Sequence, residues 1–290
     1  MKKVLITGAN SYIGTSFEKY MALQQEPYQI DTLDMLDVSW REKDFSKYDV
    51  VFHVAGIAHS DSGKISEEKS RLYYSVNTDL TIETAKKAKS EGVSQFIYMS
   101  SAIVYGESAS ISKKKVITKD TPVSPANCYG DSKVQAEKGL IPLGDEKFKV
   151  VILRPPMIYG KGSKGNYPIL SKLAKKLPIF PYVKNERSML YIENLAEFIK
   201  LMIDNEEGRI FFPQNNEYSN TSEIVKMIGA VHKKNVRLLK GFSWILKLMS
   251  YFVGIVNKAF GNFCYDQSMS EYKVDYRKVS LKESILRTEA

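Results

Sequence analysis

The first fourteen residues constrain the fold of this chain more than any other stretch. Residues 3–7 form a short apolar run that predicts a buried strand, and this run leads directly into a glycine-bearing turn and a predicted helix that ends near Gln25. In this order the turn lets backbone approach a phosphate, while the helix N-terminus offers unpaired N–H groups and the positive end of its dipole. We therefore expect the turn to hold a dinucleotide through Gly8, Ser11, Tyr12, Ile13 and Gly14.

Strands and helices continue to alternate after this turn. The sequence predicts four more strands, at 28–33, 50–54, 95–99 and 148–153, with helices between them at 72–90 and around Tyr129. Such alternation is typical of a parallel sheet with helices on both faces. We predict an α/β fold with a doubly wound parallel sheet over residues 1–160, to which a strand near 209–213 returns as an edge.

Beyond Gly160 the pattern loosens. A glycine-rich, basic loop at 161–166 precedes predicted helices at 168–176 and 221–229, the second with Ser222 as its N-cap. We expect residues 161–290 to form mostly a smaller, mainly helical, substrate-binding lobe that is interleaved with the sheet.

The composition is that of a globular protein, with 43% hydrophobic and 26% charged residues in a chain of 290. The formal net charge of +9 would suit a nucleic acid, an anionic membrane, or a lysine-rich surface with an anionic substrate. No aromatic residues interleave with the densest basic run, at 113–115, as a nucleic-acid stacking platform would need. We expect an anionic substrate and no nucleic-acid partner.

Cysteine usage and hydropathy indicate a cytoplasmic protein. Cys128 and Cys264 have no metal-ligand spacing, so we expect no metal site and a reducing compartment. The apolar run before Gly8 is too short for a signal peptide. Three polar residues interrupt the longest apolar segment, 242–260, which falls short of a spanning helix of about 20 apolar residues. We interpret it as a packed amphipathic helix, with peripheral membrane contact as the alternative.

A carboxylate ends the second predicted strand. Asp34 follows the glycine turn by about twenty residues, where it would accept hydrogen bonds from both ribose hydroxyls of a dinucleotide and repel a 2′-phosphate. This favours NAD, with NADP as the alternative cofactor. We place Asp37 and Val38 among the cofactor-binding residues as well. The other interpretation is that Asp31, Asp34 and Asp37 are only loop carboxylates.

Two other predicted strands end in candidate site residues. Ala55 and Gly56 follow the strand at 50–54, where small residues would let a cofactor lie across the sheet edge. Ser101 follows the strand at 95–99. Side chains at the carboxyl ends of parallel strands point into the crevice where ligands of such sheets bind, so Ser101 has a functional interpretation.

Tyr129 and Lys133 lie four residues apart on a predicted helix, which puts both side chains on one face. A phenol with its ordinary pKa of about 10 is a poor acid or base at neutral pH, so a neighbouring cation is needed to make its charged form accessible. Lys133 can supply that cation. Taken alone, the pair is more typical of a solvated helix face, and its functional weight comes from the other motifs.

Five ordered motifs resemble the extended short-chain dehydrogenase/reductase family, and within it the nucleotide-sugar epimerases and reductases. They are Thr-Gly-Ala-Asn-Ser-Tyr-Ile-Gly at 7–14, Val-Ala-Gly at 54–56, Asn77, Ser-Ser-Ala-Ile-Val-Tyr-Gly at 100–106 and Tyr-Gly-Asp-Ser-Lys at 129–133. The resemblance covers essentially the whole chain. It implies a Rossmann fold, a bound NAD or NADP, a UDP-sugar substrate and a homodimer.

The resemblance implies roles at the reacting carbon. Ser101 and Tyr129 would hydrogen-bond the sugar oxygen, with Tyr129 exchanging its proton. Lys133 would hold the nicotinamide ribose and, with the positive ring of the cofactor, lower the pKa of the phenol. Asn77 resembles the family's asparagine on the neighbouring helix, and a helix cap or a core hydrogen bond is an equal alternative.

Later residues match the family as well. Arg187 resembles an arginine that binds the substrate diphosphate, a task suited to bidentate pairing. Asn166 resembles an asparagine that contacts the same region, and Pro156 is expected beside the cofactor.

Three departures from the family pattern bear on the reaction. Ser11 replaces a middle glycine, which weakens the phosphate turn without removing it. Ala102 and Ile103 stand where related dehydratases carry an acidic pair, so dehydration is not expected. Met157 stands where common UDP-galactose 4-epimerases have an asparagine, and it resembles a branch that includes UDP-4-keto-hexosamine reductases.

We therefore expect an NAD-dependent C4 epimerase of a UDP-hexose or UDP-N-acetylhexosamine that works through a transient 4-keto intermediate. The alternative is a 4-ketoreductase that consumes NADH or NADPH, in which the cofactor carries the same chemistry. A third interpretation is a non-catalytic dinucleotide-sensing protein on the same fold. Asp34 favours the first and Met157 the second.

Overall fold

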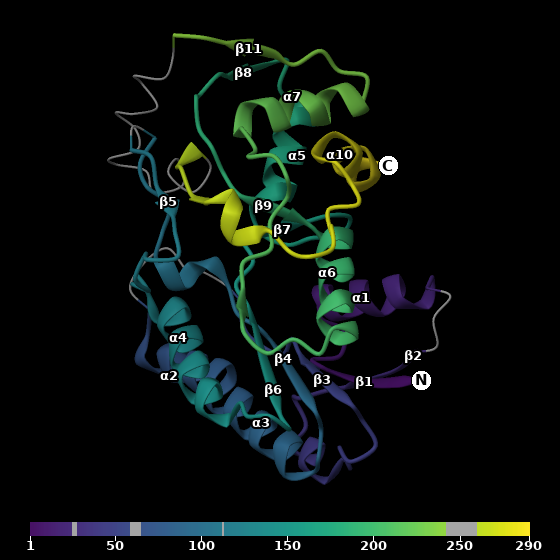
Figure 1. Cartoon of the computed structure of the whole chain (residues 1–290). Helices are drawn as coiled ribbons and strands as arrows, with labels where there is room; N and C mark the ends of the chain where they lie inside the picture. Colours follow the sequence, from purple (N-terminus) through teal and green to yellow (C-terminus); the bar gives the residue numbers. More distant parts are fainter. Residues whose placement is uncertain (25–27, 59–64, 112, 242–259) are drawn as a thin grey trace. The chain divides into compact units, whose positions relative to one another are not determined.

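The computed structural model describes residues 1–24, 28–58, 65–111, 113–241 and 260–290 (Figure 1). The chain divides into two compact units. Unit 1 consists of residues 1–106, 122–155 and 196–213, and unit 2 consists of residues 107–121, 156–195 and 214–290. Each unit is therefore assembled from three separate stretches of sequence.

Unit 1 is built on a six-stranded parallel sheet. The strands are β1 (Lys2–Thr7), β2 (Tyr28–Leu33), β3 (Val50–His53), β4 (Gln95–Met99), β6 (Lys149–Leu153) and β10 (Ile210–Phe211). Their order is β10-β6-β4-β3-β1-β2, and every pairing is parallel. The strand order reverses at β1, which has β2 on one side and β3 on the other. The predicted doubly wound sheet is confirmed, and β10 is the predicted returning edge strand.

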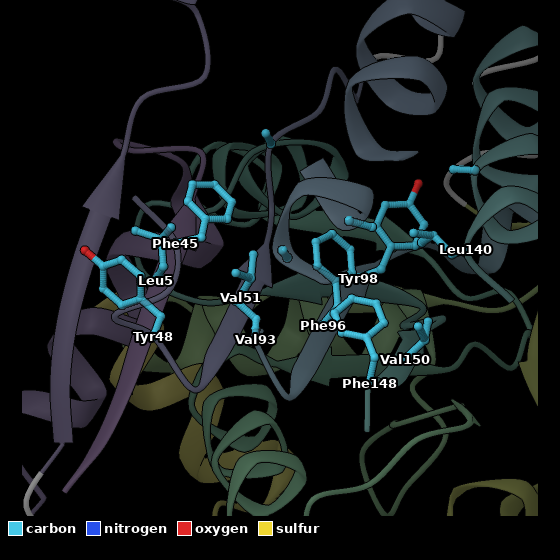
Figure 2. Packing of buried hydrophobic residues seen from close by; sticks show 14 of the residues in the cluster. Leu5, Phe45, Tyr48, Val51, Val93, Phe96, Tyr98, Leu140, Phe148 and Val150 are labelled. Atoms are coloured by element: carbon cyan, nitrogen blue, oxygen red, sulfur yellow. The ribbon is translucent and has the colours of Figure 1, made fainter. Parts of the chain in front are cut away.

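Apolar side chains cover both faces of this sheet, as buried parallel strands require. On one face Val51 and Phe96 belong to a buried cluster that includes Leu140 of α4 (Cys128–Leu140), as Figure 2 shows. On the other face the ring of Phe52 packs edge-on against Phe17 of α1 (Tyr12–Ala22), with centroids 5.3 Å apart. This two-sided burial fixes where each strand ends, and so positions the residues that follow it.

A continuous helical run occupies the region where one helix was predicted at 72–90. It consists of α2 (Glu67–Tyr74), a π-helical turn (Ser75–Asp79) and α3 (Leu80–Ser90). Ser66 caps the run, since its side chain accepts a hydrogen bond from the Lys69 N–H. The helix therefore starts earlier than the apolar pattern indicated.

Helix α6 (Ile192–Asp204) contributes its later residues to unit 1. The amide of Gln95, at the start of β4, donates to the carbonyl of Met202 at 2.9 Å and to that of Glu207 at 2.9 Å. The hydroxyl of Tyr20 on α1 donates to Glu197 at 2.7 Å. The end of α6 is thus bonded to the first half of the chain.

Unit 2 combines helices with small parallel sheets. Its described part contains α5 (Asn166–Lys176), α7 (Thr221–Val231) and α10 (Leu281–Glu289). Three strand pairs accompany them: β8 (Ile179–Pro181) with β11 (Arg237–Leu239), β5 (Val116–Ile117) with β12 (Cys264–Tyr265), and β7 (Met157–Tyr159) with β9 (Met189–Tyr191). Helix α5 begins before the predicted 168, because Pro168 falls in its first turn, where a missing N–H costs no helical hydrogen bond.

The N-cap predicted for α7 is wrong. Asn220 caps this helix, and its Oδ1 accepts hydrogen bonds from the backbone N–H groups of Ser222 and Glu223 at 2.9 and 3.1 Å. The Ser222 hydroxyl instead accepts from the Val183 N–H at 3.0 Å and donates to the Pro181 carbonyl at 2.9 Å. Asparagine and serine cap helices about equally well, so sequence preference could not rank them.

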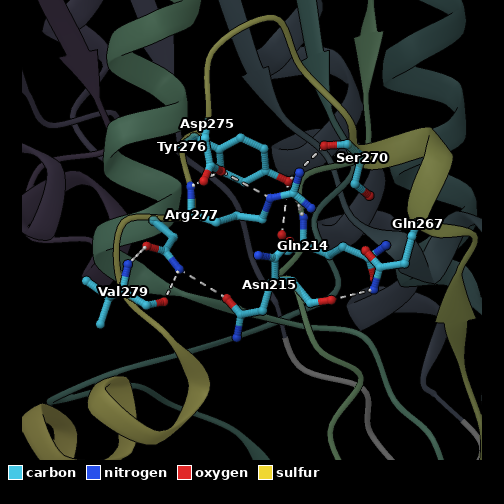
Figure 3. Close-up of polar contacts among 10 residues, drawn as sticks. Gln214, Asn215, Gln267, Ser270, Asp275, Tyr276, Arg277 and Val279 are labelled. Carbon is cyan, nitrogen blue, oxygen red and sulfur yellow. Dashed lines mark hydrogen bonds and ion pairs between the residues drawn. The ribbon is translucent and has the colours of Figure 1, made fainter.

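Buried polar side chains hold the C-terminal part of unit 2 (Figure 3). The Tyr276 hydroxyl accepts from the Gln214 N–H at 3.0 Å and donates to the Gln214 carbonyl at 2.9 Å. Asn194 bonds both backbone groups of Val279, at 3.0 and 2.9 Å. Residues 242–259, most of the segment expected to form an amphipathic helix, lie outside the described residues. Within the described ranges no helix is both long and apolar enough to span a bilayer.

Candidate active site

The glycine turn lies between β1 and α1, next to the point where the strand order reverses. Gly8 has a φ of +107°, and a Cβ there would lie 2.7 Å from the backbone nitrogen of Ala55. The Gly8 N–H donates to the Leu33 carbonyl at the end of β2, at 2.9 Å. The turn is therefore held against the ends of β2 and β3, in the crevice where ligands of such sheets bind.

Ser11, which departs from the expected glycine pattern, caps α1. Its hydroxyl accepts a hydrogen bond from the Gly14 N–H at 3.1 Å. A Cβ at Gly14 would lie 2.7 Å from that hydroxyl and 3.1 Å from a methyl group of Ile6. Tyr12 and Ile13 form the first turn, whose N–H groups have no acceptor within the helix. The serine thus stabilises the turn through a hydrogen bond to one of the N–H groups at the helix N-terminus, which leaves that group unavailable to a ligand.

The acidic residues after β2 divide into two kinds. Asp31 accepts a hydrogen bond from the Tyr48 hydroxyl at 2.7 Å and is part of the folded body. Asp34 and Asp37 are exposed, and each accepts a hydrogen bond only two residues ahead, at 3.0 Å. Val38, which opens a one-turn helix (Val38–Glu42), is also exposed. Two carboxylates of this loop therefore face solvent.

Asn77 is fully buried in the π-helical turn between α2 and α3. Its Oδ1 accepts from the Ile57 N–H at 2.9 Å, and its Nδ2 donates to the Ile57 carbonyl and the Ser132 hydroxyl, both at 3.1 Å. A Cβ at Gly56 would lie 3.0 Å from Asn77 Oδ1 and 3.4 Å from Lys133 Nζ. Asn77 therefore makes core hydrogen bonds, which was the alternative to a role in the site, and it also lies beside Lys133. Turns of this kind are frequent at functional sites.

Lys133 is buried, and its side chain is oriented by the end of β4. Its Nζ donates to the Met99 carbonyl at 3.0 Å and lies 4.8 Å from the centroid of the Tyr98 ring. Burial lowers the pKa of Lys133 to about 8, and the negative charge of Glu137 opposes that shift. The ammonium is thus fixed in position and only weakly held in its charged form.

Tyr129 lies one turn before Lys133 on α4 and is partly buried. Burial raises the pKa of the phenol to about 12, a hydrogen bond with Ser101 lowers it, and Tyr73 raises it. The Tyr73 and Tyr129 rings have centroids 6.0 Å apart. Ser101 itself follows β4 and accepts from the Ile103 N–H at 3.3 Å. The end of β4 and the face of α4 thus bring Ser101, Tyr129 and Lys133 together.

Sequence reasoning missed a buried ionic network behind this face of α4. The carboxylate of Glu137 accepts from the Ser100 hydroxyl at 2.5 Å, and from Arg154 through Nε at 3.0 Å and Nη2 at 2.5 Å. Arg154 also donates to the Tyr105 hydroxyl at 2.7 Å. The network joins α4 to the ends of β4 and β6. Its one sequence signal is that Glu137 follows Tyr129 by two helical turns on the same face.

His53, at the end of β3, was also missed. Its Nδ1 lies 2.7 Å from the Thr7 hydroxyl and its Nε2 lies 3.0 Å from the Thr81 hydroxyl. Burial and then the charge of Lys133 lower the pKa of His53 to about 3. The imidazole is therefore neutral at ordinary pH, and both of its nitrogens are engaged.

The residues expected to contact the substrate diphosphate belong to unit 2. Asn166 is the first residue of α5. Pro156, which is expected beside the cofactor instead, also belongs to unit 2 and is buried just before β7. Arg187 exchanges backbone hydrogen bonds with Ser219 at 3.0 and 2.9 Å, and burial lowers the pKa of its guanidinium. Their contacts with a ligand stay predictions.

A family model and named relatives match the sequence. A sequence model of the NAD dependent epimerase/dehydratase family matches residues 4–212. A UDP-glucose 4-epimerase of Vibrio cholerae is 30% identical over 300 residues, covering 95% of this chain and 90% of that protein. The N-acetyl-alpha-D-glucosaminyl-diphospho-ditrans,octacis-undecaprenol 4-epimerase of Escherichia coli O157:H7 is 29% identical over 219 residues, covering 70% of this chain and 63% of that protein.

Solved structures share the fold. A dTDP-4-dehydrorhamnose reductase from Clostridium acetobutylicum has a TM-score of 0.74 at 20% identity, covering 99% of this chain and 98% of its own. A UDP-glucuronic acid 4-epimerase from Bacillus cereus, in complex with NAD, has a TM-score of 0.72 at 18% identity, covering 98% and 96%. At these identities the likeness concerns the α/β fold.

Proposed function

The chain belongs to the NAD dependent epimerase/dehydratase family, and from this premise we propose that it is a C4 epimerase of a UDP-hexose or UDP-N-acetylhexosamine. The observation that carries the proposal is the arrangement at the end of β4. There the buried ammonium of Lys133 is held by the Met99 carbonyl, one helical turn from Tyr129. The Tyr129 hydroxyl in turn is hydrogen-bonded with Ser101. A positioned phenol next to a fixed cation is suited to moving one proton at one oxygen.

The glycine turn of unit 1 fits NAD. Gly8 and Gly14 have no room for a Cβ, so bare backbone would meet the pyrophosphate at the first turn of α1. The carboxylates of Asp34 and Asp37 would accept hydrogen bonds from the ribose hydroxyls and would repel a 2′-phosphate. Arg41, the nearest arginine, is paired with Glu83 at 2.5 Å and so is already engaged. The remaining contacts would come from Ser11, Tyr12, Ile13, Val38, Ala55, Gly56, Asn77 and Pro156.

Tyr129 would carry the proton of the sugar O4, and Ser101 would hold that oxygen. A phenol whose pKa is about 12 is almost entirely protonated near pH 7, so the cation on Lys133 is needed to stabilise the phenolate that would accept the proton. The chemistry that NAD would supply when bound is hydride transfer: it would take up the hydride from C4 and later give it back to C4. The flat ketone would turn over between these two events, so the same residues would act twice. Asn166 and Arg187 would retain the diphosphate meanwhile.

A 4-ketoreductase is the second candidate. Met157 at the start of β7 favours it, and the Clostridium acetobutylicum enzyme of the same fold is a reductase by name. The same three residues would act once and in one direction, and NADH or NADPH would be consumed. Dehydration is less well supported, because Ala102 and Ile103 provide no acid or base.

The decisive experiment asks whether purified protein carries NAD and interconverts UDP-GlcNAc and UDP-GalNAc without added cofactor. That result supports the epimerase. Oxidation of NADPH by a 4-keto sugar nucleotide, with no interconversion, would replace it by the reductase. Because the E. coli relative is named for an undecaprenol-linked sugar diphosphate, that substrate is offered in parallel.

The role of Tyr129 is tested by the Tyr129→Phe variant. Loss of the hydroxyl should lower turnover by about 10²-fold or more while NAD still binds. Tyr74→Phe is the matched control, since its hydroxyl bonds Asp131 at 2.7 Å, and it should retain most activity. Full turnover by Tyr129→Phe would exclude the phenol as the proton carrier.

A further inference from the structure

Positive charge is concentrated in two segments of unit 2. Residues 156–185 contain six lysines, residues 224–241 contain four lysines and one arginine, and neither segment contains an aspartate or a glutamate. All eleven basic side chains are exposed. The whole chain has 42 basic and 33 acidic residues, so the absence of carboxylates here exceeds what the overall composition explains.

The two segments lie next to each other in the fold (Figure 1). Helix α5 packs on α7, and β8 pairs with β11 in parallel. The Arg237 N–H donates to the Pro178 carbonyl at 2.9 Å, and the Tyr182 N–H donates to the Leu239 carbonyl at 2.8 Å. The basic residues of both segments therefore gather on one part of unit 2.

The neighbouring carboxylate neutralises only one of these cations. Glu289 of α10 lies 2.9 Å from Lys175, and it also contacts His232 at 2.7 Å. The other ten basic side chains form no ion pair among the residues that the structure describes. Their charge is thus available to an anionic partner.

The outward face of the β8–β11 pair adds apolar side chains to this charge. The register places Ile179 opposite Arg237, and Leu239 follows two residues later on the same face. Ile179 is 47% exposed and Leu239 is 38% exposed, whereas Phe180 on the opposite face is only 4% exposed. Leu177, just before β8, is 39% exposed. Apolar side chains in contact with water thus lie among unpaired cations.

We propose that this face, which we call the basic ribbon, docks on the surface of an anionic phospholipid membrane. It comprises Ile179, Arg237 and Leu239 on the strand pair, with Lys176, Leu177, Lys233, Lys234 and Lys240 flanking them. Clustered lysine and arginine are attracted to anionic headgroups, and exposed aliphatic side chains enter the headgroup boundary. Among the described residues the ring of Tyr182 lies beside these cations, 6.0 Å from Lys240 Nζ, and a single ring does not make the series of stacking rings that a nucleic-acid site would need. The inference is independent of the proposed reaction, because no ribbon residue belongs to the candidate site.

The test is sedimentation of the full-length protein with vesicles of phosphatidylcholine alone and of phosphatidylcholine mixed with phosphatidylglycerol. We expect binding to the mixed vesicles only, and a decline as salt is raised, because exposed charges are screened. The variant Lys176→Glu/Arg237→Glu/Lys240→Glu should reduce the partition coefficient by at least tenfold. Ile179→Ser/Leu239→Ser should also weaken binding, and the ratio between its partition coefficient and that of the wild type should change little with salt.

A matched control changes the same net charge on unit 1. Lys19, Lys86 and Lys147 are exposed there, and their triple replacement by glutamate should leave vesicle binding nearly unchanged. The thermal unfolding midpoint reports on folding in every variant. Equal loss in the ribbon and control variants would reduce the effect to net charge and overturn the proposal. So would binding that survives both ribbon variants, or RNA binding that equals vesicle binding and ignores the apolar replacements.

Discussion

At the scale of single residues, burial disfavours the charged forms of the two groups on which the proposed proton transfer depends. The pKa of Lys133 is lowered to about 8 and that of Tyr129 is raised to about 12, and burial is the main cause of both shifts. Each shift disfavours the charged form. A positive charge brought by a bound cofactor would favour the phenolate of Tyr129 and would disfavour the ammonium of Lys133, so cofactor occupancy acts on the two groups in opposite directions.

Replacing Lys133 by glutamine should lower turnover by about 10²-fold or more, because the phenolate of Tyr129 loses its nearest cation. The pH at which activity is half-maximal should rise as well. Lys138→Gln, on the exposed side of the same helix, is the control and should keep the wild-type profile. Equal rate losses in the two variants would show that helix charge alone matters.

His53 predicts an acid-sensitive fold. Its pKa is about 3 in the folded protein and about 6.5 in an unperturbed histidine, so below pH 6.5 the unfolded chain binds more protons and stability falls as the pH is lowered. At about pH 5 the free energy of unfolding should have lost roughly 2 kcal/mol through this residue. Urea unfolding of the wild type and His53→Gln between neutral and acid pH measures the difference. An unchanged pH slope in the variant would contradict the assignment.

At the scale of elements, α4 is positioned by an ion pair that its own sequence does not reveal. Glu137 and Arg154 are both buried, and the pair fixes the helix against the ends of β4 and β6. Tyr129 and Lys133 lie on the same helix, so their placement depends on this anchor. Removing either partner leaves a buried charge without compensation.

We expect Glu137→Gln to destabilise the fold by about 3 kcal/mol or more. Glu137→Met/Arg154→Met should recover part of that loss, because it leaves no unpaired charge. Chemical denaturation of Glu137→Met, Arg154→Met and the double variant gives the coupling energy of the pair. Strict additivity would show that the two side chains do not interact energetically.

The glycine turn makes an equally local prediction. Gly8→Ala would place a Cβ 2.7 Å from the Ala55 nitrogen at a φ that L residues rarely adopt. We expect a loss of thermal stability and of bound NAD together. Gly165→Ala has a similarly positive φ with nothing within 4 Å, so it isolates backbone strain from the steric clash. Similar losses in both variants would mean that the close approach to Ala55 is unimportant.

The sequence predicted those features that depend on neighbours along the chain. Strand-like stretches of sequence located the six strands of the sheet, and the spacing of Tyr129 and Lys133 placed them on one helix face. The cap of α7 was missed because Asn220 and Ser222 are similar caps, and only the tertiary bond to Val183 distinguishes them. The Glu137–Arg154 pair was missed because it forms only when α4 packs on β6.

At the scale of the whole molecule, neither unit is a continuous piece of chain. Unit 1 takes β10 and the end of α6 from residues 196–213. A fragment of residues 1–160 would leave the β6 edge unpaired and would remove both acceptors of the Gln95 amide. We expect this fragment to aggregate, whereas the full chain stays monodisperse in light scattering. A soluble fragment with cooperative unfolding would show that β10 is dispensable.

The position of β10 also sets an order of events during synthesis. Strands β1 to β6 leave the ribosome before residues 156–195, which belong to unit 2, and the last strand of the sheet follows those residues. The growing chain therefore carries an open sheet edge until residues 210–211 emerge and pair with β6. Over that interval the exposed edge of β6 is a template on which a strand of another chain could pair.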